Sequence, residues 1–315
     1  MNSSPSVQPR VAIVLATYNG EEFLRPQLDS LLTQEYVNFV IVARDDGSRD
    51  ATPAILQHYA SMHPEKFQLL DSGGMNLGAS ASFSMLIEYV LAHEELLGLE
   101  QAYIMFCDQD DVWHGDKIGK SMRVMLALEA KHPHRACLVH SDLRVIDEQG
   151  KELAPSFFAY QEIRPHKHTF ARLLVSNSVT GCTVMINAKL ATLASPIPTQ
   201  AIMHDWWLAL VTSSIGYVRP IDEALMDYRQ HQNNTLGAVQ INRTGFAMRK
   251  LRRLNDPQYD KFNARLATQA ASFAGRHFAN LKNRDIFVLS IALWMKSRYR
   301  WLRNGVYLGF IWLFA

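Results

Sequence analysis

The stretch that decides the fold is Tyr103-Ile104-Met105-Phe106-Cys107-Asp108-Gln109-Asp110-Asp111-Val112-Trp113, residues 103–113. An apolar run typical of a buried strand ends in three carboxylates within four positions. Carboxylates this close repel one another, and burying them is costly unless they are paired or bound to a metal. A divalent cation with oxygen ligands, which often bridges a phosphate-bearing ligand, explains such a cluster at a strand end. An acidic surface turn is the alternative.

Short apolar runs alternate with helical segments on the N-terminal side of this stretch. The pattern predicts strands at 11–16, 39–43 and 67–70, and helices at 21–34, from Asp50 to Tyr59, and at 80–93. Such alternation predicts an α/β protein with a mostly parallel central sheet and helices on both faces. Ligands of such sheets bind at the carboxyl ends of the strands. The polar groups 17–19, 45–46 and 108–110 follow three strands, so we expect them on one rim.

The C-terminal side continues with a predicted helix at 117–131, a strand at 137–145 with a hairpin turn at 147–150, and a helix at 204–214. Neither the phosphate-loop pattern GxxxxGK[ST] nor GxGxxG occurs, which counts against P-loop and Rossmann dinucleotide chemistry. The three cysteines form no CxxC pair, which fits a reducing cytosol. The six apolar residues 11–16 are too short for a signal peptide, so we expect a cytoplasmic protein.

Charge divides the chain of 315 residues into two predicted parts. Residues 1–240 hold 18 Lys and Arg against 27 Asp and Glu, whereas residues 241–315 hold 14 against 3. We therefore expect a body at 1–240 and a basic, helical C-terminal region at 241–315. A basic tail after an acidic body indicates an anionic partner, such as a membrane surface or nucleic acid.

Seven motifs together resemble a known family. They are ATYNG (16–20), DDGSRD (45–50), NLGAS (76–80), CDQDD (107–111), GCT (181–183), HDWW (204–207) and YRQH (228–231). In this order, over about residues 10–235, the chain resembles family 2 glycosyltransferases of the GT-A fold, and most closely bacterial rhamnosyltransferases of polysaccharide and O-antigen assembly. The resemblance implies an inverting, metal-dependent transferase that moves L-rhamnose from dTDP-rhamnose to a cell-surface glycan or lipid-linked acceptor. A UDP-hexose or UDP-N-acetylhexosamine donor stays open.

The resemblance also implies which residues bind the nucleotide-sugar donor. Asp46 would accept a hydrogen bond from a pyrimidine N–H, or alternatively cap the next helix. Asp108 would contact the ribose or a metal-bound water, and Arg229 would pair with a phosphate or lie solvated on the surface. Gly181 lies in a loop beside the donor sugar, or simply permits a tight turn. The expected set is Thr17, Tyr18, Asn19, Asp46, Asn76, Gly78, Asp108, Gly181, Cys182 and Arg229.

Asp110 and His231 are the expected metal ligands. Carboxylate oxygen suits Mg²⁺ and Mn²⁺, and a neutral imidazole is a good further ligand for Mn²⁺. A histidine buried in the core is the alternative for His231. Asp111 would orient the acceptor or brace its loop, and the indoles of Trp206 and Trp207 would stack on the acceptor.

Asp205 is the expected catalytic base. Transfer with inversion requires a carboxylate that deprotonates an acceptor hydroxyl as this hydroxyl attacks the anomeric carbon. Asp205 in HDWW matches the family position of that base. An aspartate that caps the helix starting at Trp206 is the alternative reading.

The C-terminal region predicts attachment to a membrane surface. Basic clusters at 249–253 and 296–303 accompany apolar runs at 286–295 and 305–315. Each run has about half of the roughly 20 residues that span a bilayer, while basic residues beside Trp and Tyr suit a helix in the headgroup region. We therefore expect peripheral attachment at the cytoplasmic face of the inner membrane. Packing of this helix on the body, or a dimer contact, is the alternative.

Two other functional classes remain open on the sequence. A nucleotidyltransferase also joins an α/β sheet to acidic metal ligands, but ATYNGEEF (16–23) offers no glycine-rich phosphate loop with a basic residue. A non-catalytic module that binds a nucleotide sugar or glycan would not need Asp205. No nucleic-acid-binding module is recognisable, so we expect no nucleic acid partner.

Overall fold

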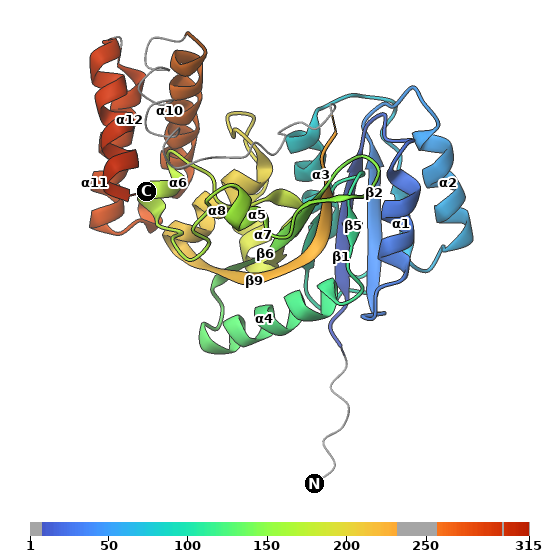
Figure 1. Ribbon diagram of the computed structural model, residues 1–315. Helices are drawn as coiled ribbons and strands as arrows, with labels where there is room; N and C mark the ends of the chain where they lie inside the picture. Colours follow the sequence, from blue (N-terminus) through green and yellow to red (C-terminus); the bar gives the residue numbers. More distant parts are fainter. Residues whose placement is uncertain (1–7, 232–256, 298, 315) are drawn as a thin grey trace.

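The computed structural model describes residues 8–231, 257–297 and 299–314 (Figure 1). Its strands form one sheet in the order β3-β2-β1-β4-β8-β6-β9-β5, with β7 paired to β6. The strands are β1 (Val11–Thr17), β2 (Phe39–Asp45), β3 (Phe67–Leu70), β4 (Tyr103–Cys107), β5 (Val112–Trp113), β6 (Ala136–Ile146), β7 (Glu152–Ala154), β8 (Met185–Asn187) and β9 (Gly216–Arg229).

Helices cover both faces of this sheet and continue into a C-terminal group. The α-helices of the body are α1 (Leu24–Leu32), α2 (Thr52–Met62), α3 (Ala79–Ala92), α4 (Lys117–Lys131), α5 (Phe157–Tyr160), α6 (Phe170–Leu173), α7 (Ala188–Ala194) and α8 (His204–Ile215). The C-terminal α-helices are α10 (Pro257–His277), α11 (Asn283–Leu293) and α12 (Arg300–Phe314), with short 3-10 turns η1 (Gly181–Thr183), η2 (Phe278–Asn280) and η3 (Trp294–Lys296).

The N-terminal half of the sheet is parallel, as the sequence predicts. β1 pairs in parallel with β2 and β4, and β2 pairs in parallel with β3. Alternate residues of β1 pack into opposite cores: Ala12 and Val14 on one face, Ile13 and Leu15 on the other. Successive strand residues point to opposite faces, so a strand covered on both sides reads as a continuous apolar run.

The second half of the sheet is mixed rather than parallel. β8 runs antiparallel to both β4 and β6, and β5 runs antiparallel to β9. Among the described strands, parallel pairing outside the N-terminal half occurs between β6 and β9. The predicted hairpin after β6 is present, because β7 pairs antiparallel to β6 across the turn.

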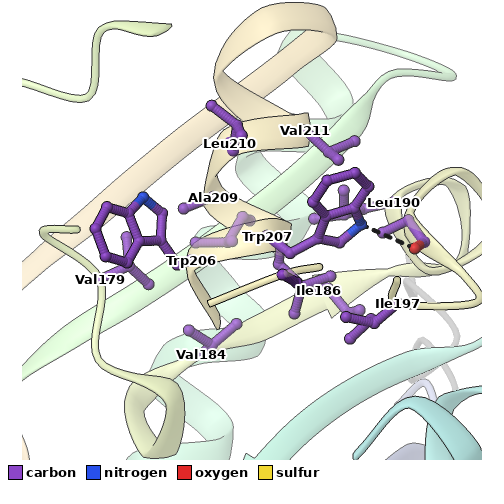
Figure 2. Packing of buried hydrophobic residues seen from close by; sticks show 14 of the residues in the cluster. Val179, Val184, Ile186, Leu190, Ile197, Trp206, Trp207, Ala209, Leu210 and Val211 are labelled. Atoms are coloured by element: carbon purple, nitrogen blue, oxygen red, sulfur yellow. Dashed lines mark hydrogen bonds between the residues drawn. The ribbon is translucent and has the colours of Figure 1, made fainter. Parts of the chain in front are cut away.

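The two tryptophans of α8 lie in the hydrophobic core (Figure 2). Trp207 is 0% exposed, and its indole N–H donates to the carbonyl of Ala194. Trp206 is buried as well and donates its N–H to the carbonyl of Leu173. The prediction that both indoles stack on an acceptor is therefore wrong, because each is enclosed and its polar atom has a backbone partner.

The C-terminal helices pack on the body. Leu266 and Phe273 of α10, Leu289 of α11 and Met295 of η3 belong to the same core cluster as the residues of α8. The structure thus supports packing on the body, the alternative raised for this region. No helix in the described part of the chain is long and apolar enough to cross a membrane. The basic cluster at 249–253 and Arg298 lie outside the described residues.

Candidate functional site

A cavity of about 360 Å³ opens at the carboxyl ends of β1, β2 and β4. It collects loops that are far apart in the sequence, as expected for the rim of an α/β sheet. Its lining includes nine residues predicted for the site, namely Thr17, Tyr18, Asp46, Asn76, Gly78, Asp108, Asp110, Gly181 and Asp205. Further lining residues outside the predicted set of site residues are Ala16, Ala79, Ser82, Phe83, Gln109, Thr180, Met203, His204 and Tyr228.

Asp46 organises one wall of this cavity. Its carboxylate forms an ion pair with Arg44 and accepts the backbone N–H groups of Leu77 and Gly78, each at 2.7 Å. Burial acts to raise the pKa of Asp46, but these hydrogen bonds outweigh it and hold the pKa below its ordinary value. Asn76 donates its side-chain N–H to the carbonyl of Asp46. The loop at 75–78 is thus tied to the end of β2.

Gln109, between the two acids, fixes the loop after β1. Its Oε1 accepts the N–H of Tyr18 at 2.7 Å, and its Nε2 donates to the carbonyl of Tyr18 at 3.1 Å. Asn19 braces the same loop from the other side: its N–H donates to Ser48 Oγ, and its Oδ1 accepts the N–H of Arg49. Asn19 is not part of the cavity lining. The sequence predicted that Asn19 lies in this loop, but not that its polar groups bind Ser48 and Arg49.

Asp108, Asp111 and Cys182 form a compact cluster. One ligand atom from each lies within 4.8 Å of the others. Burial, followed by repulsion from Asp110, raises the pKa of Asp108 to about 7. The pKa of Asp111 is raised well above its ordinary value for the same two reasons. Among the described atoms, Asp111 Oδ2 is buried without a hydrogen-bond partner, whereas Oδ1 accepts the N–H of Arg229.

Asp111 and Cys182 lie behind the cavity wall. Asp111 is 0% exposed and Cys182 is 1% exposed. The predictions that Asp111 contacts an acceptor and that Cys182 contacts the donor are therefore wrong. Asp111 instead braces its loop, which was the alternative for it.

Asp110 and His231 meet at the edge of the cavity. His231 Nε2 lies 2.8 Å from Asp110 Oδ2, and the His231 ring packs against Phe23 at 5.0 Å between centroids. Arg229 lies beside them and donates to the carbonyls of Asp110 and Glu148. Of these residues, only Asp110 is in the cavity lining. Arg229 is buried, so the surface alternative is wrong for it.

Asp205 lies in the first turn of α8, one residue after its start at His204. Met203 occupies the N-cap position and makes no side-chain cap hydrogen bond, so Asp205 lies inside the first turn rather than at the capping position. The Oδ1 of Asp205 accepts the N–H of Trp206 at 2.5 Å. Burial raises the pKa of Asp205 to about 7, although hydrogen bonds from Trp206, Gly181 and Asn177 act to lower it.

Gly181 is packed tightly against this turn. A Cβ atom at Gly181 would lie 2.8 Å from His204 Nε2, closer than real Cβ contacts allow. A glycine here thus permits the close approach of η1 to α8, which lets its N–H reach Asp205. His204 is buried between the rings of Phe83 and Phe106, and burial lowers its pKa to about 3, so it is neutral at pH 7.

A fully buried lysine lies beneath the acidic cluster. Lys117 donates to the carbonyl of Cys182 at 2.6 Å and lies 3.6 Å from the centre of the Trp113 ring. Burial lowers the pKa of Lys117 to about 8, against the attraction of nearby acidic groups that include Asp111 and Asp108. Sequence reasoning missed this residue, because a lysine is rarely fully buried and it opens a helix with an ordinary amphipathic pattern.

Comparison with known proteins decides the family. Residues 12–186, more than half of the chain, match the family model described as glycosyl transferase family 2. The chain belongs to glycosyltransferase family 2. This glycosyltransferase is 29% identical over 232 residues to "dTDP-rhamnosyl transferase RfbG" of Shigella flexneri, covering 71% of this chain and 74% of that protein.

Other relatives extend the comparison. The glycosyltransferase is 25% identical to TuaG of Bacillus subtilis, named as a teichuronic acid biosynthesis glycosyltransferase, over 79% of this chain and 90% of that one. It spans 63% of the length of three mycobacterial relatives that also match. Its fold is like that of Staphylococcus aureus TarS 1–349, solved in complex with UDP-GlcNAc, at a TM-score of 0.51 and 13% identity, over 96% and 92% of the two chains. The predicted GT-A fold is confirmed.

Proposed function

We propose that this glycosyltransferase is an inverting, divalent-metal-dependent enzyme that moves a sugar from a nucleotide-sugar donor to a glycan or lipid-linked acceptor. One observation carries the proposal. Asp108 and Asp110 after β4 and Asp205 at the start of α8 line the same cavity, although about a hundred residues separate them in the chain. Family membership gives this cavity its chemistry, since a nucleotide sugar carries a diphosphate that an acidic, metal-binding rim would accept.

Asp205 is the proposed base. Its carboxylate would take the proton of an acceptor hydroxyl while the hydroxyl oxygen bonds to the anomeric carbon. The bond from that carbon to the diphosphate oxygen breaks on the opposite face, and the nucleoside diphosphate leaves with the electron pair. A carboxyl with a pKa of about 7 suits this role at neutral pH, because a general base works best near the operating pH.

The residues around Asp110 fit a hard divalent cation. Asp110 and Asp108 offer carboxylate oxygens, and His231 offers an imidazole nitrogen, which are ligands that Mg²⁺ and Mn²⁺ accept. Cys182 fits such a cation poorly, since its sulfur is soft and burial raises the thiol pKa well above its ordinary value. A cation held by Asp110 and His231 would neutralise the charge that develops on the leaving diphosphate.

The proposed donor is dTDP-rhamnose. This choice follows the sequence resemblance, and the name of the Shigella relative supports it. UDP-hexoses and UDP-N-acetylhexosamines are the alternatives. The proposed acceptor is lipid-linked, and the proposed location is peripheral, at the cytoplasmic face of the inner membrane.

A donor panel tests the proposal. Purified protein is incubated with dTDP-rhamnose, UDP-glucose, UDP-galactose and UDP-GlcNAc, with Mn²⁺, Mg²⁺ or a chelator, and release of the nucleoside diphosphate is measured alongside calorimetric binding. We expect metal-dependent release from dTDP-rhamnose. Release from a UDP-sugar alone would show that the donor is a UDP-sugar, while the proposed transfer reaction would still stand. Absence of binding and release with every donor and metal would overturn the proposal.

A further inference from the structure

The outer face of α11 and η3 departs from the pattern of a solvated helix. Asp285, Leu289 and Ala292 are buried, and their spacing places them on one stripe that packs toward the body. The opposite stripe should be polar. Instead it carries Phe287, 66% exposed, and Trp294, 58% exposed, which are seven residues and therefore two turns apart on the same side. Figure 1 shows α11 at the outer edge of the molecule, away from the sheet.

The structure reduces the number of residues in this region that can contact a membrane, compared with the sequence prediction. Of the apolar run at 286–295, Leu289, Ala292 and Met295 are inside the core. Tyr307 and Phe310 of α12 are buried as well. These residues are therefore not available to a membrane, and the aromatic side chains left outside on the α11 face are Phe287 and Trp294. With the neighbouring exposed Tyr299, we call Phe287, Trp294 and Tyr299 the aromatic face.

Basic side chains surround the aromatic face. Lys282, Arg284 and Lys296 flank it in sequence and are exposed. Residues 257–315 contain two acids, Asp260 and Asp285. Asp285 pairs with Arg284 at 3.3 Å and Asp260 pairs with Arg303 at 2.9 Å, so these two acids do not offset Lys282 and Lys296. The face therefore combines exposed aromatic rings with the positive charge of the exposed Lys282 and Lys296.

Exposed aromatic rings beside positive charges indicate what kind of partner the aromatic face would bind. Trp and Tyr rings prefer the interface between headgroups and acyl chains, and Lys and Arg side chains near an anionic bilayer are attracted to it. A second copy of the chain would bring the same positive charges face to face, which opposes self-association. An anionic surface with an apolar layer beneath it satisfies both the rings and the charges.

We propose that the aromatic face of α11 and η3 docks this glycosyltransferase on an anionic phospholipid surface, with Phe287 and Trp294 inserted as anchors. The biological purpose rests on the proposed function, since a lipid-linked acceptor lies at such a surface. The docking itself needs no donor, so it is measured separately. The core stripe of α11 keeps the helix fixed to the body, so docking would orient the whole enzyme.

Vesicle sedimentation with the full chain tests the proposal. The probes are phosphatidylcholine vesicles with and without phosphatidylglycerol. We expect binding to the anionic vesicles, weakened by high salt because screening shortens electrostatic attraction. The double variant Phe287→Ser/Trp294→Ser should bind at least tenfold more weakly, with an unchanged melting curve because both side chains are exposed. The matched control is Met62→Ser/Leu96→Ser, which alters side chains 62% and 70% exposed on the body and should bind like the parent.

Each outcome of these experiments either supports or overturns the docking proposal. Equal sedimentation of the double variant and the parent, or no binding of the parent to anionic vesicles, overturns the proposal. A parent that is dimeric in solution, binds no vesicles and becomes monomeric in the double variant would identify a second copy as the partner and also overturn it. Nucleotide release from the donor panel should be the same in the double variant and the parent. If no donor is used while vesicle docking holds, the proposed transfer fails and the docking inference stands.

Discussion

The Nε2 atom of His231 lies 2.8 Å from the Oδ2 atom of Asp110, although 121 positions separate the two residues in the chain. Both side chains are largely enclosed, at 9% and 14% exposure. Adjacent ligands of an octahedral cation with bonds near 2.1 Å are about 3 Å apart, so the two atoms already have the spacing of neighbouring ligands. The pair predicted from the sequence is therefore in contact, and its metal role can be tested directly.

Replacing His231 should weaken metal activation. We expect His231→Ala to lower the apparent affinity for Mn²⁺ by roughly 10–100-fold, the range seen when a metal site loses a supporting group. Donor hydrolysis measured across a Mn²⁺ titration, together with Mn²⁺ binding by electron paramagnetic resonance, reports this. His166→Ala is the control, since His166 forms an exposed pair with Asp222 away from Asp110. Superimposable titrations of His231→Ala and the parent would contradict a ligand role.

Removing the carboxylate of Asp205 should slow transfer strongly but leave donor binding intact. We expect Asp205→Asn to reduce the transfer rate by about 10²–10⁴-fold, the usual contribution of a general base, because an amide cannot take the acceptor proton. Calorimetry with the donor should give nearly the parent's affinity. Asp222→Asn, at an exposed carboxyl, is the matched control and should transfer normally. Unimpaired transfer by Asp205→Asn would show that Asp205 is not the base and would overturn the proposed mechanism.

Transfer should rise with pH toward a plateau above about pH 7. Burial raises the pKa of Asp205 to about 7, and only the ionised carboxylate can act as a base. The profile of kcat/KM against pH should therefore bend near 7 on its acidic side. A bend near pH 4, where an ordinary aspartate ionises, would show that Asp205 is not held in this environment or is not the base.

The raised pKa of Asp205 also predicts that the stability of the protein falls, whereas transfer rises, as the pH increases. The carboxyl of Asp205 has an ordinary pKa of 3.8 and a folded pKa of about 7. Between these values the folded state holds a proton that the unfolded state has lost, so the free energy of unfolding falls as pH rises from about 4 to about 7. Asp205→Asn should thus stabilise the protein by about 1–4 kcal/mol at pH 8, and much less at pH 4. Urea unfolding at both pH values measures this, and equal effects at the two would contradict it.

The parts of the fold that the sequence predicts are those with a strong local pattern. β1 is a continuous apolar run because it is buried on both faces, and α3 follows its own helical period. β5 and β8, of two and three residues, form because neighbouring strands offer hydrogen bonds, which leaves no signal in their sequences. β9 was not predicted along its 14 residues, since Pro220 and three acids interrupt its apolar pattern.

The site was predictable where residue type and strand position agree. Asp108 and Asp110 follow a strand, so their place on the rim follows from the topology. Trp206 and Trp207 follow Asp205 directly, but helical geometry turns their side chains inward, and residue type alone does not distinguish an acceptor platform from a core. Gln109 was overlooked between two acids, although its amide is what fixes the Tyr18 loop.

Lys117 provides the last prediction, because it connects the acidic cluster to the base. Its ammonium binds the carbonyl of Cys182 in η1, and the adjacent Gly181 donates its N–H to Asp205. Lys117→Met keeps the shape but removes the charge, leaving a buried carbonyl unpaired and the acids uncompensated. We expect a loss of about 3–5 kcal/mol in the free energy of unfolding, typical of breaking a buried charge pair.

A bound divalent metal should restore part of the stability that Lys117→Met loses. A divalent cation bound beside Asp108 would restore positive charge near the cluster, so Mn²⁺ should raise the melting temperature of Lys117→Met more than that of the parent. Lys120→Met is the matched control: Lys120 is in the same helix but pairs at the surface with Asp116, so its loss should cost under about 1 kcal/mol. A Lys117→Met protein as stable as the parent, with the same response to Mn²⁺, would mean that the buried ammonium does not compensate the acids.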